Sequence, residues 1–225
     1  MQKQLKRQFK TQLFDQFARI GRALSNAHRI ELLDVLAQGE RSVEQLAAET
    51  DLTVANASQH LQVLRQAGLI DARRDGVRVL YTLAGPEVFG LWQALRTTGE
   101  SRLADIQRVV ATFLREREQM EVIGPDELRR RLATGEVTLL DVRPALEYRQ
   151  GHIDGAWSIP IDLLPERVAD IPRERPVVAY CRGPYCVYAD EAVELLRSNG
   201  RRAARLTIGY PDWQAAGLPV TTSDE

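Results

Sequence analysis

The chain has 225 residues, of which 44% are hydrophobic and 27% are charged, and its formal net charge is −1. This composition is ordinary for a globular protein with one large domain or two small ones, and no apolar stretch has the length of a membrane span. Because the chain has only two cysteines and no apolar leader at its N-terminus, we expect a cytoplasmic protein with no disulfide framework and no membrane partner.

The charge is unevenly distributed along the chain. Residues 1–120 carry 17 Lys and Arg against 14 Asp and Glu, whereas residues 121–225 carry 13 against 17. A basic half followed by an acidic half indicates two domains with different partners. We therefore expect one domain over residues 1–120 and a second over residues 121–225.

The first half is predicted to consist mainly of helices. Apolar residues recur at three- and four-residue steps from Leu5 to Leu24, which is the pattern of an amphipathic helix. Three shorter helices are expected to follow, each behind a side chain that can cap it. These are a helix that starts after Ser25 or Asn26 and ends near Gly39, a helix over Val43–Glu49 with Ser42 and Gln45 as a capping box, and a helix over Val54–Ala67 behind Thr53.

A hairpin and a long helical segment complete this half. Residues 70–74 and 77–83 alternate apolar and polar side chains around Asp75-Gly76, which is a strong signal for a tight turn. Pro86 suits the first position of a helix, and the helical pattern behind it runs to about residue 120, with a break expected at Thr97–Gly99. The charged segment Leu114–Met120 has no Gly or Ser, so we expect a helical connection and not a flexible tether.

The second half changes to an alternation of strands and helices. Leu139–Val142 and Pro176–Tyr180 are short apolar runs typical of buried parallel strands. Helical patterns lie between and after them, at Asp126–Ala133 and Val187–Ser198. The predicted fold class is therefore a mainly α domain followed by an α/β domain with a parallel sheet.

The two short helices and the hairpin occur in the order of a winged helix-turn-helix, whose second helix lies in the DNA major groove. Projecting residues 54–65 at 100° per residue places Ala57, Leu61 and Leu64 on the core side. The polar side chains opposite can contact base edges, and arginines of the hairpin can pair with phosphates. The candidate DNA-binding residues are Asn56, Ser58, Gln59, Gln62, Arg73, Arg74 and Arg78.

Two segments of this half, His28–Leu33 and Ser58–Ile70 (SQHLQVLRQAGLI), closely resemble the ArsR (arsenic-repressor-like) family of dimeric bacterial repressors. The resemblance covers about residues 10–95. It implies a homodimer, paired through its first and last helices, on a palindromic double-stranded operator. Many members sense metals with cysteines before the recognition helix or with histidines on the last helix, and this chain has neither. His28 and His60 are too isolated for a metal site, so we expect no metal and no cofactor.

Both cysteines of the chain lie in one six-residue loop, Cys181–Cys186, between a predicted strand and a predicted helix. Backbone N–H groups and the dipole at a helix N-terminus favour an anion there, lower the pKa of a cysteine and produce the nucleophilic thiolate. Two buried cysteines without reactivity are the alternative. The placement of every cysteine in one strand-to-helix turn favours a reactive thiol at Cys181.

Motifs around this loop look like the rhodanese domain, over about residues 121–221. They are Leu140–Pro144, Glu147, Gly151–Ala156, Ile159-Pro160, Trp213 and Gly217–Val220. The resemblance implies a rhodanese-like fold in which the thiolate at the start of the active loop, here Cys181, takes a sulfane sulfur atom and holds it as a persulfide. Arg182 can attract an anionic sulfur donor, although a solvated surface arginine is equally compatible with the sequence. Asp141, Arg143, Glu147 and His152 are expected to be structural.

Two details of the loop refine this interpretation. Related phosphatases and arsenate reductases need an arginine six positions after the cysteine to clamp an oxyanion, and that position is Val187 here. Simple rhodaneses have no cysteine at the position that matches Cys186. Because it lies five residues from Cys181 in one curved loop, we predict that it resolves a Cys181 persulfide into a disulfide or polysulfide bridge, with a packing role as the alternative.

The sequence as a whole favours a cytoplasmic, dimeric repressor that senses reactive sulfur species through Cys181 and Cys186. Its expected partners are operator DNA, a sulfane-sulfur donor and a second copy of the chain. One alternative is a rhodanese sulfurtransferase with an accessory DNA-binding domain. Another is a regulator in which the two thiols bind a soft metal or metalloid, although two thiolates are few for such an ion.

Overall fold

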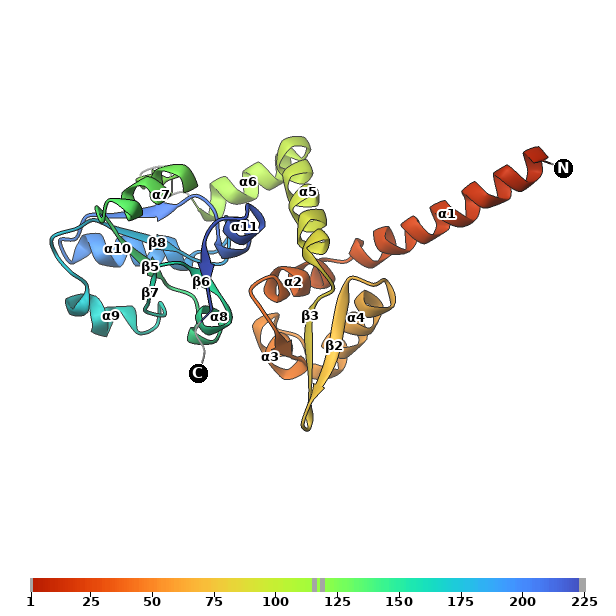
Figure 1. The fold of residues 1–225 in the computed structure, drawn as a ribbon, viewed down its shortest axis with the longest axis horizontal. Coiled ribbons are helices and arrows are strands. Elements are labelled where there is room, and N and C mark those ends of the chain that lie inside the picture. Colours follow the sequence, from red (N-terminus) through yellow and green to blue (C-terminus); the bar gives the residue numbers. More distant parts are fainter. Residues whose placement is uncertain (1, 115–116, 118–119, 223–225) are drawn as a thin grey trace. The chain divides into compact units, whose positions relative to one another are not determined.

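The computed structural model describes residues 2–114, 117 and 120–222 (Figure 1). The chain divides into two compact units, Met1–Leu95 and Arg96–Glu225. The first has the winged helix-turn-helix fold and the second a rhodanese-like α/β fold with a parallel sheet, so the predicted fold class is confirmed. No helix among the described residues is both long and apolar enough to cross a membrane.

The first unit places a pair of short helices next to a small antiparallel sheet. Apolar side chains of the helices and of the hairpin form one core, which includes Leu32, Leu46, Leu61 and Ile70. The elements are α1 (Gln2–Leu24), α2 (Ala27–Leu36), β1 (Arg41–Ser42), α3 (Val43–Glu49), α4 (Val54–Gln66), β2 (Ile70–Asp75) and β3 (Arg78–Leu83), and the strands are ordered β1-β3-β2.

The caps expected from the sequence are present. Asn26 accepts a hydrogen bond from the Arg29 N–H at the start of α2. Ser42 and Gln45 form the reciprocal capping box of α3, and Thr53 accepts from the Asn56 N–H at the start of α4. Each cap satisfies an N–H group that the first turn of a helix leaves without a partner, so a few local side chains determine where these helices begin.

Two local predictions were wrong. The hairpin turn lies at Gly76-Val77, because Asp75 pairs with Arg78, and Gly76 supplies the positive φ of 59°. The expected break at Thr97–Gly99 is absent: α5 (Pro86–Arg102) runs through it and the break falls at Leu103, before α6 (Ala104–Phe113). A Cβ on Gly99 would lie 2.9 Å from Cδ1 of Ile106, so close packing of α6 explains the glycine inside α5.

The connection after α6 is only partly described. Residues 115, 116, 118 and 119 of the segment expected to be helical lie outside the described residues. Arg117 is described, and its contacts are given below.

The second unit is built on a five-stranded parallel sheet with strand order β4-β9-β8-β5-β7. One core cluster joins this sheet to α9 and α10, and another joins it to α7 and α11. The elements are β4 (Val122–Ile123), α7 (Pro125–Ala133), β5 (Thr138–Asp141), α8 (Ala145–Gln150), β6 (His152–Ile153), β7 (Trp157–Ser158), α9 (Leu164–Arg167), β8 (Val177–Tyr180), α10 (Tyr188–Ser198), β9 (Ala203–Leu206), α11 (Tyr210–Ala215) and β10 (Val220–Thr221). The carboxyl ends of β8 and its neighbours carry the loops described next.

Candidate functional site

The cysteine loop, residues 181–186, joins the carboxyl end of β8 to α10. It is a tight turn, in which the Cys186 N–H donates to the Gly183 carbonyl at 3.2 Å and the Tyr210 N–H donates to the Cys181 carbonyl at 3.2 Å. Gly209 packs so closely that a Cβ there would lie 2.2 Å from the Arg182 carbonyl oxygen. The segment before α11 therefore holds the loop against the end of the sheet.

Both cysteines are free thiols. Cys181 is 2% exposed, and its thiol lies 3.5 Å from the Cys186 carbonyl oxygen and 3.9 Å from that of Gly183. Burial raises the pKa of Cys181 well above its ordinary value. The hydrogen bond from Cys181 lowers the pKa of Cys186 to about 7, aided by the N–H groups of Arg182 and Tyr188.

This charge distribution differs from the one expected from the sequence, which placed the thiolate on Cys181. The loop N–H groups and the neighbouring thiol lower the pKa of the partly exposed Cys186, whereas burial raises the pKa of Cys181. Cys186 is therefore the thiol of the pair that loses its proton more readily. A pair with one thiolate near neutral pH has the chemistry of a reactive dithiol.

Arg182 does not extend freely into solvent. Its guanidinium donates to Oε1 of Glu147 from Nε at 3.0 Å and from Nη2 at 2.5 Å, and the side chain of Glu147 is fully buried. The Arg182 charge also contributes to the lowered pKa of Cys186. Arg182 thus anchors the loop to α8, which leaves less of its charge available for an incoming anion.

Three polar side chains that the sequence did not single out also hold the loop. Arg117 donates to the carbonyl oxygens of Pro184 and Cys186 and to Asp190. The Nε atom of Arg205 lies 2.9 Å from Oδ1 of Asp190, and the two side chains form an ion pair whose angles are not those of a hydrogen bond. The Nη2 atom of Arg205 lies 3.4 Å from the Pro184 carbonyl oxygen. No sequence signal marks these residues, because they come from three separate segments of the chain.

A buried polar cluster supports the strand ends below the loop. Arg143 donates to Oδ2 of Asp141 at 2.6 Å, and both side chains are fully buried. The Tyr180 hydroxyl donates to the same carboxylate at 2.6 Å and accepts from the Ile153 N–H. The partners of Asp141 and Arg143 are those of structural residues, and a buried charge pair of this kind needs such a set of hydrogen bonds.

The recognition helix α4 shows the two faces that its sequence predicts. Ala57, Leu61 and Leu64 are fully buried in the core of the first unit. The polar candidates on the helix are all exposed, and they are Asn56, Ser58, Gln59 and Gln62. Short amide and hydroxyl side chains are therefore presented along one accessible helix face, as contact with DNA bases requires.

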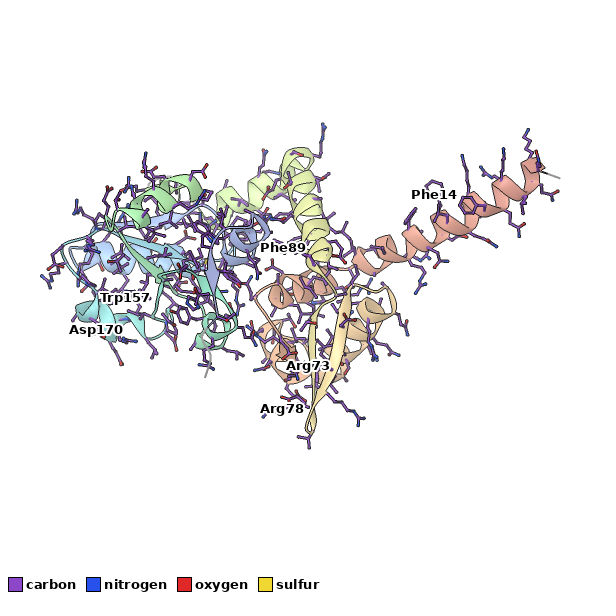
Figure 2. The ribbon with its side chains drawn as sticks, viewed as in Figure 1. Phe14, Arg73, Arg78, Phe89, Trp157 and Asp170 are labelled. Atoms are coloured by element: carbon purple, nitrogen blue, oxygen red, sulfur yellow. The ribbon has the colours of Figure 1, made fainter. Side chains whose placement is uncertain are left out.

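The arginines of the hairpin differ in their surroundings. Arg73, Arg74 and Arg78 are all exposed, and Arg73 also donates to both carboxylate oxygens of Glu40, at 2.7 and 2.6 Å. Figure 2 shows Arg73 and Arg78 on the β2–β3 hairpin. Arg78 and Arg74 have the accessibility that a phosphate contact requires, while Arg73 already has an anionic partner.

His28 and His60 are neighbours despite their separation in sequence. Their ring centroids lie 5.7 Å apart, and the pKa of His60 is lowered by burial. Within the part of the chain that the structure describes, no group of three or more His, Cys, Asp or Glu side chains could hold a metal ion.

Comparison with known proteins accounts for both units. Residues 26–72 match the family model "Bacterial regulatory protein, arsR family", and residues 124–216 match "Rhodanese-like domain". The HTH-type transcriptional regulator Rv0324 of Mycobacterium tuberculosis is 46% identical over 94% of this chain and 92% of its own length. A sulfurtransferase of Allochromatium vinosum is 35% identical over 45% of this chain and 95% of its own length. The homodimeric winged helix-turn-helix DNA-binding domain Mb0332 from Mycobacterium bovis is 44% identical over 42% of this chain and 87% of that chain, with a TM-score of 0.40.

Proposed function

We propose that this chain, which belongs to the ArsR-type HTH transcriptional regulators that carry a rhodanese domain, is a dimeric repressor that responds to sulfane sulfur at Cys181 and Cys186. The observation that carries the proposal is the pair of free thiols in one loop at the carboxyl end of β8, with the thiol of Cys181 against the Cys186 carbonyl oxygen. These are the two cysteines of the whole chain, and the DNA-binding unit contains none. A signal received by a thiol must therefore enter through the cysteine loop.

The chemistry follows from the unequal pKa values of the two thiols. Cys181 transfers its proton to the Cys186 thiolate and attacks the terminal sulfur of a hydropersulfide RS–SH. A bond forms between Cys181 and that sulfur, the RS–S bond breaks, and RS⁻ leaves. The product is a Cys181 persulfide beside a Cys186 thiol, and loop N–H groups can stabilise charge on the added sulfur.

Cys186 then completes the reaction. It attacks the inner sulfur of the Cys181 persulfide, a Cys181–Cys186 disulfide forms, and the outer sulfur leaves as hydrogen sulfide with the two protons. The two thiols are oxidised and the sulfane sulfur is reduced, so no further oxidant is needed. A thiol such as dithiothreitol reverses the change.

The DNA-binding half is proposed to act as a homodimer. On α1, large apolar side chains that a monomer would leave in water recur at four-residue steps along one side, at Leu5, Phe9, Leu13 and Phe17. Phe14 lies beside this row, with its ring edge-on to that of Phe17. Figure 2 shows Phe14 on this helix. A continuous apolar stripe of this kind is suited to a second copy of the same helix, and a two-fold dimer would present two α4 helices to a palindromic operator.

The test joins intact-mass measurement to operator binding before and after polysulfide treatment. Polysulfide should convert the wild type to the disulfide, which is lighter by two hydrogen atoms, and should leave the mass of Cys181→Ser unchanged. Operator affinity of the wild type should fall on loading and return with dithiothreitol. Cys186→Ser should take up sulfur yet respond less, since no disulfide can form. A fully modified wild type with unchanged operator affinity would overturn the sensor proposal.

A second candidate is a sulfurtransferase that uses its DNA-binding half for location. It is favoured by the 35% identity to the Allochromatium vinosum sulfurtransferase over nearly all of that protein. Thiosulfate would supply the sulfur and sulfite would leave. Steady turnover to an acceptor thiol, together with DNA binding that ignores the state of Cys181, would favour this candidate over the repressor.

A further inference from the structure

The guanidinium of Arg117 holds two carbonyl groups of the cysteine loop at once. It donates to the Pro184 oxygen and, at 2.8 Å, to the Cys186 oxygen, while its Nε donates to Asp190 at 2.7 Å. Its side chain is only 16% exposed, so these bonds lie largely out of water. Charge-assisted hydrogen bonds from a planar guanidinium fix geometry as well as charge.

One of these two carbonyl groups, that of Cys186, also contacts a thiol. The Cys186 oxygen that Arg117 binds also lies 3.5 Å from the thiol of Cys181. A persulfide or disulfide at Cys181 has no thiol proton at that sulfur, so this contact is lost. A disulfide additionally requires the two Cβ atoms to come within about 3.5–4.5 Å, which moves residue 186 and its carbonyl group. Because the Pro184 and Cys186 oxygens must both face one guanidinium, a change in the loop disturbs the bonds to Arg117.

Arg117 lies between α6 and β4, the first strand of the rhodanese sheet. The loop makes a second bond to this part of the chain, from the Tyr185 hydroxyl to Glu100 on α5 at 2.5 Å. Arg96, also on α5, pairs with Asp212 of α11. Helix α5 begins in the first compact unit and ends in the second, so its backbone is continuous with both.

We propose that Arg117 positions the cysteine loop and transmits its thiol state to α6 and α5. This inference rests on the proposed function, because sulfur loading of the loop is the event that is transmitted. In the reduced state Arg117 holds the loop and the connection together. In the disulfide state the two carbonyl groups turn away from the guanidinium, and the connection is released from the loop.

The experiment compares Arg117→Met with Arg108→Met in the full-length chain. Arg108 lies on α6 and pairs only with the exposed Asp105 in the described contacts, so its replacement is a matched control. Loading is followed by intact mass and driven to equal occupancy in every variant. Operator affinity and hydrogen exchange of peptides from α5 and α6 are then measured in both states.

In the wild type and in Arg108→Met, loading should raise exchange in α6 and weaken operator binding by roughly 5- to 150-fold, the usual range of allosteric coupling. In Arg117→Met the ratio of the two affinities should fall to about 1, and exchange should no longer depend on loading. Arg117→Lys keeps a positive charge beside Asp190 but reaches one acceptor at a time, so it should fold and show a reduced ratio. Wild-type ratios in both Arg117 variants would overturn the proposal.

A second arm separates this inference from the proposed function. Diamide oxidises Cys181 and Cys186 to a disulfide and is itself reduced to the hydrazine, so it closes the loop without any sulfane sulfur. If polysulfide neither forms the disulfide in the wild type nor adds sulfur to Cys186→Ser, the proposed function is wrong, and the diamide disulfide still tests the transmission. A disulfide that changes α6 exchange in the wild type but not in Arg117→Met supports the inference. One that leaves wild-type exchange unchanged refutes it.

Discussion

Replacing Cys181 by alanine should raise the pKa of Cys186. The Cys181 thiol is the largest cause of the lowered pKa, about 7 against an ordinary value of 9.0, and burial of Cys186 acts in the opposite direction. A hydrogen bond donated to the thiolate stabilises its charged form, so removing the donor moves the pKa toward 9 or above. Two pKa units correspond to about 2.7 kcal/mol between the two protonation states. At pH 7 the thiolate fraction would fall from about one half to about one hundredth, roughly a 50-fold loss of nucleophile.

The assay is the rate of iodoacetamide alkylation of Cys186 between pH 5.5 and 10, followed by intact mass. The wild type should give a midpoint near 7, and Cys181→Ala should shift it upward by about two units. Cys186→Ala is the matched control, in which the buried Cys181 should react slowly up to pH 9 because its pKa is raised. An unchanged midpoint in Cys181→Ala would show that the thiol–thiol bond is not what stabilises the Cys186 thiolate.

Two further predictions concern the DNA-binding unit. Ser58→Ala and Gln59→Ala should reduce discrimination between operator and random duplex. Arg78→Ala should weaken binding to both duplexes alike and lower the slope of log affinity against log salt by about 1. Binding isotherms over a salt series distinguish the two patterns, and equal losses on both duplexes for the helix variants would contradict the assigned helix face. Phe17→Glu places a charge in the exposed apolar stripe of α1 and should shift the chain from dimer to monomer in light scattering, and an unchanged mass would exclude that stripe as the interface.

Features that depend on neighbouring residues were predicted from the sequence. The Ser42–Gln45 capping box and the Thr53 cap involve side chains within three residues of the N–H groups that they satisfy. The buried face of α4 follows from helical periodicity alone, because Ala57 and Leu61 recur at a four-residue step. The strand containing Leu140 was found in the same way, since a run buried on both faces is continuously apolar.

Features that depend on distant parts of the chain were not predicted. The break after α5 moved to Leu103 because Gly99 is needed where α6 packs, and a sequence pattern records low helix propensity without recording that contact. The pairing of Arg182 with Glu147 joins residues 35 positions apart. The charge on Cys186 depends on the burial of Cys181 and on which thiol donates to which, and neither quantity is present in a sequence.

The contacts of α5 offer a route for the proposed regulation of DNA binding by the cysteine loop. Its first half belongs to the winged-helix unit, where the Trp92 indole donates to Asp34 of α2 at 2.9 Å. Its second half carries Glu100, which accepts from Tyr185 of the cysteine loop. The proposed regulation uses this helix, because a rigid secondary element can carry coupling where a flexible linker does not. The required coupling is small: about 2 kcal/mol, within the usual range of 1–3 kcal/mol, would change operator affinity about 30-fold. Loss of one charge-assisted hydrogen bond at Arg117 is of this size, since such a bond contributes about 1.5–3 kcal/mol net of exchange with water.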